Sequence, residues 1–265
     1  KNIYHTDFPY PWLKNLNDKK FFSSSLRKRF PKNFNFRKKI TMVILETFQG
    51  WGAIFYPKKY VKEIEKFCKK NNIILCFDEM QSGFGRTGKK FGFQHYGVSP
   101  DLICCGKGMG SGFPLSGIIG SNKIFNNKNV LGMSSTHSAN PLSCCAGLAT
   151  IKIMEKLKLV ENSRKQGVLL HKNLEIIKKK YNSIVLGSYG KGLIRSIVFK
   201  KFKKFSGKYI ADKVSLKCLL KGLLICNTSR ESIKLGPPLI INSKGIRKAV
   251  KILDKSIVET FNEIN

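Results

Sequence analysis

IILCFDEMQSGFGRTGKKFGFQHYGVSPDLICCGKGMGSGFPLSGIIGS, residues 73–121, is the stretch that decides the fold. It contains three short apolar runs, at 73–77, 102–105 and 116–120; the first two predict buried strands, and the third predicts a strand. About ten glycine-rich residues link the second run to the third. Because a parallel crossover needs a dozen residues or more, we expect the third strand to run antiparallel to the second.

Upstream of this stretch, the sequence predicts a strand, a helix and a strand. TMVIL at 41–45 is a short apolar run that predicts a buried strand. Val61, Ile64 and Phe67 recur at helical spacing within 58–72. A helix between two strands indicates a parallel pair, so we expect a mostly parallel sheet. Residues 1–40, which include FPYPW, predict loop with at most one short helix.

Beyond residue 121, the sequence predicts helices with a few strands. Residues 140–180 carry apolar residues at helical spacing and predict a long helix, with a second helical run from about 161. The last third is expected to be α+β, with strands at 192–199 and 223–226 and helices at 211–222 and 243–262. We place the boundary between two domains near residue 158, which gives domains at 1–158 and 159–265.

The net charge of +33 allows two interpretations. A basic surface for nucleic acid or an anionic membrane is one. The other is genomic bias, because Lys, Asn, Ile and Phe are all abundant and the basic residues are scattered. We favour genomic bias, since the sequence has no nucleic-acid-binding motif and no apolar run near the ~20 residues that cross a bilayer. We therefore expect no membrane partner and disfavour nucleic acid as a partner.

The eight cysteines form no CxxC pair, and no histidine cluster has the spacing of a zinc site. We interpret them as small buried hydrophobes in a reducing compartment, which predicts a cytoplasmic protein without a metal. The chain begins at a lysine, so a missing native start stays open.

A distinctive polar residue follows each of three predicted strands. Glu46 follows 41–45, Asp78 follows 73–77, and Lys107 follows 102–105 across one glycine. Ligands of parallel sheets bind beyond the carboxyl ends of the strands, so these three side chains could share one crevice. A nucleophilic lysine and an acid for a cationic ring nitrogen are what pyridoxal phosphate needs. For any one of these residues alone, a surface lysine or a turn cap is the more ordinary explanation.

The residues together resemble a known family. The whole of 73–121 closely resembles the signature of the class III pyridoxal-phosphate-dependent aminotransferases, which include the ornithine, acetylornithine and 4-aminobutyrate enzymes. Further resemblance lies in ETFQG (46–50), STHSANPLSCCAG (135–147), GKGLIRSIVF (190–199) and KLGPPLII (234–241). The resemblance implies an α/β protein of fold type I. This chain would hold part of the large domain, with a mostly parallel sheet, and the α+β carboxyl-terminal small domain.

The resemblance also implies the roles of individual residues. Lys107 would form the Schiff base with pyridoxal phosphate and shuttle the proton, and Asp78 would pair with the pyridine nitrogen. Gln81 would lie near the phenolic oxygen of the ring. Thr136 would touch the phosphate from the partner subunit, which implies a homodimer with its site at the subunit interface. Glu46 would line the substrate pocket.

Two departures from the family pattern bear on function. Lys234 stands where the family commonly has a substrate-gripping arginine, and a lysine is a point charge where arginine offers two parallel hydrogen bonds. The family's amino-terminal part, with its phosphate-cradling loop, is not found in this chain. Three interpretations follow: a transaminase that moves an amino group between an amino donor and an oxo acid or aldehyde, an inactive or split-gene fragment that needs its amino-terminal half, or a basic nucleic-acid-binding protein. We favour the first, because the implied cofactor residues are all present.

Overall fold

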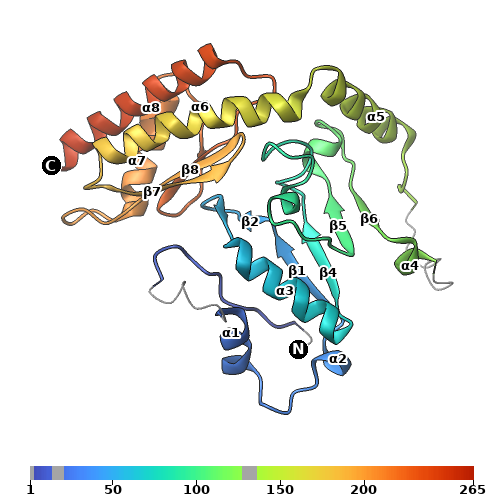
Figure 1. The fold of residues 1–265 in the computed structure, drawn as a ribbon. Coiled ribbons are helices and arrows are strands. Elements are labelled where there is room, and N and C mark those ends of the chain that lie inside the picture. Colours follow the sequence, from blue (N-terminus) through green and yellow to red (C-terminus); the bar gives the residue numbers. More distant parts are fainter. Residues whose placement is uncertain (1–2, 14–20, 127–135) are drawn as a thin grey trace. The chain divides into compact units, whose positions relative to one another are not determined.

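The computed structural model describes residues 3–13, 21–126 and 136–265, and the chain divides into two compact units (Figure 1). Unit 1 comprises Lys1–Phe48, Tyr56–Gly83 and Phe91–Ile153, and unit 2 comprises Gln49–Phe55, Phe84–Lys90 and Met154–Asn265. Each unit is therefore assembled from segments that are separated along the chain. The expected functional boundary near residue 158 stays a prediction.

Unit 1 is built on a four-stranded sheet in the order β1-β4-β5-β6. Its strands are β1 (Met42–Glu46), β4 (Ile74–Asp78), β5 (Leu102–Cys105) and β6 (Gly117–Gly120). β4 pairs in parallel with both β1 and β5, whereas β6 is antiparallel to β5. The α/β class, the mostly parallel sheet and the antiparallel direction of the last strand are thus confirmed.

Helix α3 (Lys58–Asn71) makes the connection from β1 towards β4 and buries Val61 and Ile64, as their spacing predicts. Two helices precede the sheet, α1 (Phe21–Arg29) and α2 (Phe36–Lys39), where at most one was expected. Aromatic packing accounts for the difference, because the ring centroid of Phe22 lies 5.3 Å from that of Phe67 on α3. Local sequence pattern does not report such tertiary contacts.

The expectation that the strand at 41–45 is buried is wrong for much of β1. Met42 and Ile44 are exposed, and Leu45 is buried. β1 is the edge of this sheet within the described residues, so one of its sides has no neighbouring strand. At the other edge, Ile118 and Ile119 of β6 are exposed as well. Both edges therefore leave apolar side chains uncovered by the described chain.

The long helical stretch is divided. α4 (Asn122–Phe125) is followed by α5 (Pro141–Lys156) and α6 (Leu159–Lys180), and Lys158 between the last two has a left-handed φ of 50°. Asn140 caps α5 by accepting hydrogen bonds from the N–H groups of Leu142 and Ser143 at 3.1 and 3.3 Å. Proline at the first helical position fits this start.

Unit 2 contains a second sheet in the order β7-β8-β10-β9, in which all neighbouring strands are antiparallel. Its elements are β7 (Val185–Lys191), β8 (Ile194–Phe199), α7 (Gly207–Leu220), β9 (Cys226–Asn227), β10 (Ser232–Leu235) and α8 (Ser243–Ile264). Helices α6, α7 and α8 share one hydrophobic core with this sheet. The expected α+β arrangement of the last third is observed.

Two details of unit 2 differ from expectation. The strand expected at 223–226 is wrong, because regular pairing begins only at Cys226 and Leu224 is exposed. Strands β7 and β10 were not expected. Short elements complete the chain: β2 (Phe48–Gln49), β3 (Ile54–Phe55), η1 (Gly92–His95) and η2 (Lys107–Met109).

All eight cysteines are free, and burial raises the pKa of the Cys68 thiol to about 12 and that of Cys105 to about 11. These two thiols therefore stay protonated near neutral pH.

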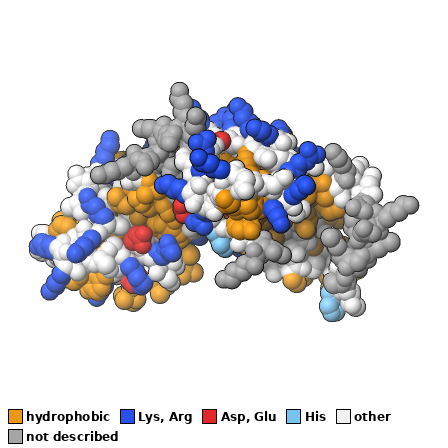
Figure 2. Space-filling view, turned by 90° about the horizontal axis from the view of Figure 1, so that it is seen from below, with side chains coloured by type: hydrophobic (Ala, Val, Ile, Leu, Met, Phe, Trp, Pro, Cys, Tyr) orange, Lys and Arg blue, Asp and Glu red, His pale blue; other side chains and the backbone are white. Residues whose placement is uncertain are grey.

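Lys and Arg side chains are spread over the face drawn in Figure 2, with few acidic ones. Of the helices the structure describes, none has the length and apolar character needed to span a bilayer.

The core of unit 2 yields a matched stability test. Leu174 on α6 is fully buried in the core cluster, whereas Ile176 two residues away is exposed. We expect Leu174→Ala to lower the free energy of unfolding by about 2–5 kcal/mol, because it leaves a cavity. Ile176→Ala should change it by about 0.5 kcal/mol or less. Urea denaturation followed by circular dichroism measures both, and equal effects would contradict the assigned core face.

Candidate active site

The carboxyl ends of three neighbouring strands, β1, β4 and β5, lie together at one end of the unit 1 sheet. Glu46, the last residue of β1, is the register partner of Asp78 at the end of β4. Asp78 is in turn opposite Cys104 of β5, and Lys107 follows three residues later. Asp78 is half-buried, whereas Glu46 and Lys107 are exposed. The structure thus brings these three residues to a single edge.

Lys107 has an unusual backbone conformation. Its φ of 45° lies in the left-handed region, which costs a non-glycine residue energy and is held only when its surroundings enforce it. The preceding Gly106 contributes to that enforcement, because a Cβ atom there would lie 2.5 Å from Sδ of Met80. Close packing of Met80 on the backbone therefore fixes the point from which the Lys107 side chain leaves the sheet edge.

The turn after β4 positions Asp78 and Gln81. Oδ1 of Asp78 accepts a hydrogen bond from the N–H of Met80 at 2.9 Å, which ties the carboxylate to the turn. Gln81 follows in the same turn and is half-buried. Both side chains therefore belong to one short, hydrogen-bonded segment.

Glu79 organises this part of the site, and the sequence alone did not predict a role for it. Its carboxylate is fully buried and accepts four hydrogen bonds. The donors are the hydroxyls of Thr47 (2.6 Å) and Ser82 (2.7 Å) and the N–H groups of Gly92 and Phe93 (both 2.7 Å). A buried carboxylate needs such donors, and here they come from three separate segments.

Gly92 allows one of these approaches. A Cβ atom at this position would lie 2.6 Å from Cγ2 of Thr47 and 2.8 Å from Cβ of Ser82. Because Gly92 has no side chain, its N–H group can reach the Glu79 carboxylate between the hydroxyls of Thr47 and Ser82. The signal in the sequence was an acid at the end of a buried strand, but its partners lie up to 32 residues away and could not be identified there.

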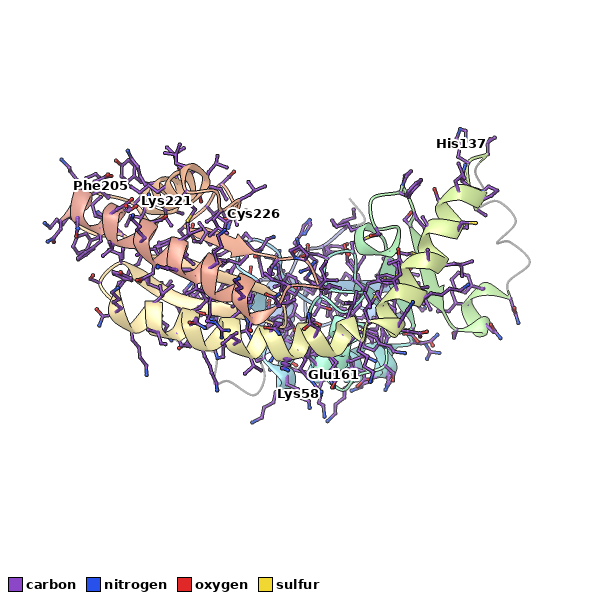
Figure 3. All side chains as sticks on the ribbon, turned by 90° about the horizontal axis from the view of Figure 1, so that it is seen from above. Lys58, His137, Glu161, Phe205, Lys221 and Cys226 are labelled. Atoms are coloured by element: carbon purple, nitrogen blue, oxygen red, sulfur yellow. The ribbon has the colours of Figure 1, made fainter. Side chains whose placement is uncertain are left out.

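Thr136 lies on a different segment of the chain from the three strand-end residues. It is exposed in the turn before α5, next to His137, which projects from the start of that helix (Figure 3). This position leaves its expected contact with a cofactor of the partner subunit a prediction. Residues 127–135, which directly precede it, lie outside the described residues.

Comparison with known proteins decides the family. The profile described as Aminotransferase class-III matches residues 2–257. The chain is 35% identical over 223 residues to acetylornithine aminotransferase of Caldanaerobacter subterraneus, covering 83% of this chain and 54% of that protein. It is 38% identical over 215 residues to acetylornithine aminotransferase of Archaeoglobus fulgidus, covering 80% of this chain and 52% of that protein. The chain belongs to the class III aminotransferases.

Solved structures agree with this assignment. A transaminase from directed evolution by ancestral reconstruction matches with a TM-score of 0.86 and 26% identity, over 97% of this chain and 59% of that one. Acetylornithine aminotransferase from Elizabethkingia anophelis matches with a TM-score of 0.76 and 29% identity, over 89% and 61%. These aminotransferases depend on pyridoxal phosphate, and fold type I is their architecture. This aminotransferase chain spans about half the length of the curated relatives it matches.

Lys234 of this aminotransferase lies in unit 2, on β10. Its Nζ donates a hydrogen bond to the carbonyl of Gly50 at 2.9 Å. The hydroxyl of Ser232 donates to the carbonyl of Trp51 at 2.8 Å, and the hydroxyl of Ser196 donates to that of Gly52. Three side chains of the second sheet thus hold three consecutive carbonyls of residues 50–52. The expected Glu46–Lys234 pair would join the two units and stays a prediction.

Two arginines of unit 2 also make defined contacts, and one of them, Arg230, lies close in sequence to Lys234. Arg86, whose pKa is lowered by burial, donates to the carbonyls of Leu193 (3.0 Å) and Pro237 (2.6 Å). It therefore fastens residues 84–90 to the segment that follows β10. The guanidinium carbon of Arg230 lies 5.4 Å from the ring centroid of Trp51, within range of a cation–π interaction.

The Glu79 arrangement generates a test. Glu79→Gln removes the charge and turns one acceptor oxygen into a donor that faces hydrogen-bond donors. We expect the free energy of unfolding to fall by about 3 kcal/mol, because hydrogen bonds to a charged group are lost in a buried place. Glu155→Gln, at an exposed position, serves as control and should have an effect of about 0.5 kcal/mol or less. Thermal and urea denaturation compare the two, and indistinguishable stabilities would refute the assigned role.

Proposed function

We propose that this chain supplies the carboxyl-terminal part of a transaminase, which moves an amino group between an amino donor and an oxo acid or aldehyde. The observation that supports it best is the placement of Glu46, Asp78 and Lys107 at one sheet edge. An amine suits the aldehyde of pyridoxal phosphate, and a half-buried carboxylate suits its pyridinium N–H. The groups at this edge therefore fit the cofactor of the family.

Each residue has a proposed task. When bound, pyridoxal phosphate supplies an electron sink for negative charge at the reacting carbon. Lys107 holds the cofactor covalently and then moves a proton from and to the substrate Cα. Asp78 accepts a hydrogen bond from the ring nitrogen and favours its protonated form. Gln81 orients the ring from the same turn, and Thr136 contacts the phosphate of the partner subunit in a homodimer.

Substrate contacts are proposed for Glu46 and Lys234. Glu46 is exposed at the strand edge, where a substrate amine could be recognised. Lys234 carries a positive charge that suits a carboxylate, although its Nζ is anchored to the Gly50 carbonyl. An ammonium anchored in this way gives weaker directional contact than a guanidinium.

We further propose that activity requires an amino-terminal half of the fold, on the same polypeptide or a separate one. Exposed apolar side chains at both edges of the unit 1 sheet support this, because an uncovered apolar edge favours association. The coverage of about half of each relative supports it too. A basic nucleic-acid-binding protein is not favoured, since no feature of the strand edge calls for it.

The lysine assignment has a direct test. We expect the chain combined with an amino-terminal half to show a visible absorption band with pyridoxal phosphate, and the chain alone to show little. Lys107→Ala should abolish the band and lower transamination by at least about a hundredfold, since the proton carrier is lost. Lys89→Ala, at an exposed lysine, is the control and should leave both unchanged. A borohydride-stable adduct at another lysine would show the assignment to be wrong.

The role of Lys234 has a separate test. If its main task is to hold Gly50, Lys234→Ala should lower kcat/KM for glutamate, alanine and simple amines to a similar extent, about tenfold or less, the equivalent of one hydrogen bond. Steady-state kinetics with these donors measures the pattern. A loss of several orders of magnitude confined to the α-amino acids would instead identify Lys234 as the carboxylate clamp.

A further inference from the structure

The lysine excess has one place in unit 2 where it gathers around exposed apolar side chains. KKFKKFSGKY at 200–209 leads into α7, and residues 200–224 contain eight lysines and a single aspartate. Phe205 lies just before the helix, and Lys221 lies just after it.

Helix α7 is apolar on two opposite faces. The inner face buries Ile210, Ala211, Val214 and Cys218 in the core cluster of unit 2. The opposite face carries Tyr209, Leu216 and Leu220, which are spaced as one helical ridge and are 39%, 52% and 76% exposed. A group of exposed apolar side chains on one ridge normally marks a surface that another molecule covers. Within the described chain, no other segment covers the apolar side chains on the outer face of α7.

Further exposed apolar residues lie close in sequence to this face. Leu219, next to the ridge, and Leu224, after the end of the helix, are 54% and 83% exposed. The ring of Tyr209 stacks on that of Phe205, with centroids 5.0 Å apart, and Nζ of Lys204 lies 5.5 Å from the centroid of Phe205. We call Lys204, Tyr209, Lys213, Leu216 and Leu220, together with Leu219 and Leu224, the outer α7 surface.

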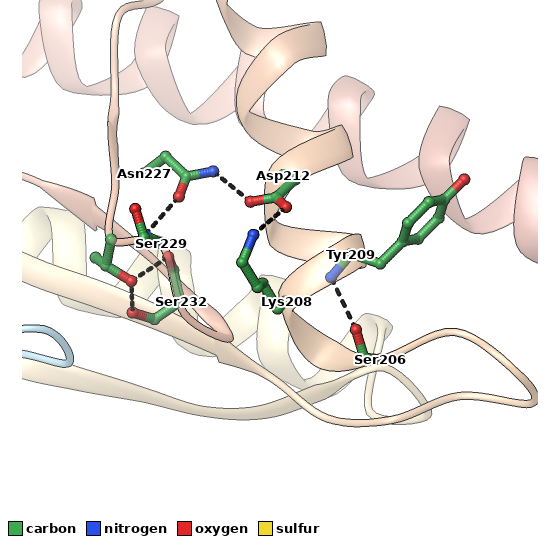
Figure 4. Close-up of polar contacts among 8 residues, drawn as sticks. Ser206, Lys208, Tyr209, Asp212, Asn227, Ser229 and Ser232 are labelled. Carbon is green, nitrogen blue, oxygen red and sulfur yellow. Dashed lines mark hydrogen bonds and ion pairs between the residues drawn. The ribbon is translucent and has the colours of Figure 1, made fainter.

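Several lysines of this region have acidic partners. Lys208 pairs with Asp212 at 2.6 Å, and Asp212 also accepts a hydrogen bond from Asn227 (Figure 4). Lys217 pairs with Glu263, and Lys221 pairs with Glu259 at 2.7 Å.

Other lysines keep their charge uncompensated. Among the described residues, Lys201, Lys204 and Lys213 have no acidic side chain within ion-pair distance, and Nζ of Lys213 lies over the ring of Tyr209. Lys213 therefore lies on the ridge of exposed apolar residues, Lys204 lies beside Phe205, and Lys201 precedes both in the same segment.

Exposed leucines among lysines fit an anionic bilayer surface. An interfacial helix buries leucine and aromatic side chains at the level of the acyl chains while lysines reach the headgroups. Anionic headgroups complement the uncompensated lysines. Single-stranded nucleic acid fits less well, because it needs exposed rings for stacking. Phe202 and Phe205 are half-buried against the core, and the most exposed apolar residues are leucines.

We propose that the outer α7 surface binds anionic membranes peripherally, with α7 lying along the bilayer surface and its leucine ridge facing the acyl chains. This departs from the sequence-based expectation of no membrane partner. That expectation rested on scattered lysines and the lack of a spanning segment, and neither bears on a surface helix. The proposal is independent of transamination.

Sedimentation of the full chain with vesicles tests the proposal. Wild-type chain should sediment with phosphatidylcholine vesicles that contain phosphatidylserine and should stay in solution with phosphatidylcholine alone. The triple variant Lys201→Gln, Lys204→Gln, Lys213→Gln should lower the partition coefficient by about a hundredfold, at about fivefold for each lysine near the surface. Leu216→Ser with Leu220→Ser should lower it by about tenfold or more, because apolar burial is lost.

A matched variant separates this surface from overall charge. Lys244→Gln, Lys248→Gln, Lys251→Gln removes the same charge from exposed positions on α8 and should lower partition by less than about fivefold. An equal loss in the α8 variant would overturn the proposal, as would equal binding to neutral vesicles or none to either. Tighter binding to a single-stranded oligonucleotide would overturn it in favour of nucleic acid. Leucine variants that alter only self-association would assign the surface to a second copy. Circular dichroism of each variant verifies folding.

Discussion

The buried carboxylate of Glu79 is the interaction on which the candidate active site depends. An ionised group without water is costly, and four short hydrogen bonds offset that cost only if their donors stay in place. The donors belong to the residue after β1, the turn after β4 and the segment that begins η1. One charge therefore locks the ends of two parallel strands and the following loop. Asp78 and Gln81 sit on both sides of it, so their backbone positions follow from the same constraint.

A second set of hydrogen bonds holds the backbone of residues 50–52. Three successive carbonyls, at residues 50–52, accept hydrogen bonds from side chains of β8 and β10 in unit 2. Backbone carbonyls at a turn would otherwise need water or a regular partner strand. Lys234 takes part in this arrangement, which gives its ammonium a structural task within the aminotransferase fold. Lys234 stands where the family commonly has a substrate-gripping arginine, but here its side chain is anchored to the backbone carbonyl of Gly50.

The positive charge shows how composition and placement differ. Counted over the chain, the lysines carry no pattern, which is why the sequence alone favours genomic bias over a binding surface. Around α7, ion pairs compensate Lys208, Lys217 and Lys221, while Lys201, Lys204 and Lys213 remain uncompensated within the described residues. The proposed membrane contact therefore depends on which lysines near the exposed leucines lack an acidic partner. The position of each lysine around the helix and its contacts with α8 decide which lysines these are.

The sequence by itself determined the direction of the central strands, because the links that precede 73–77 and 116–120 have the lengths that decide parallel or antiparallel pairing. It also placed Glu46, Asp78 and Lys107 at strand ends, since ligand residues follow strands in parallel sheets. Only the tertiary structure decided that Met42 and Ile44 are exposed, that 223–225 is irregular and that Glu79 collects four donors. A local pattern reports the periodicity of a segment, but burial and hydrogen-bond partners depend on residues 13 to 32 positions away, as for Gly92 and Thr47 around Glu79.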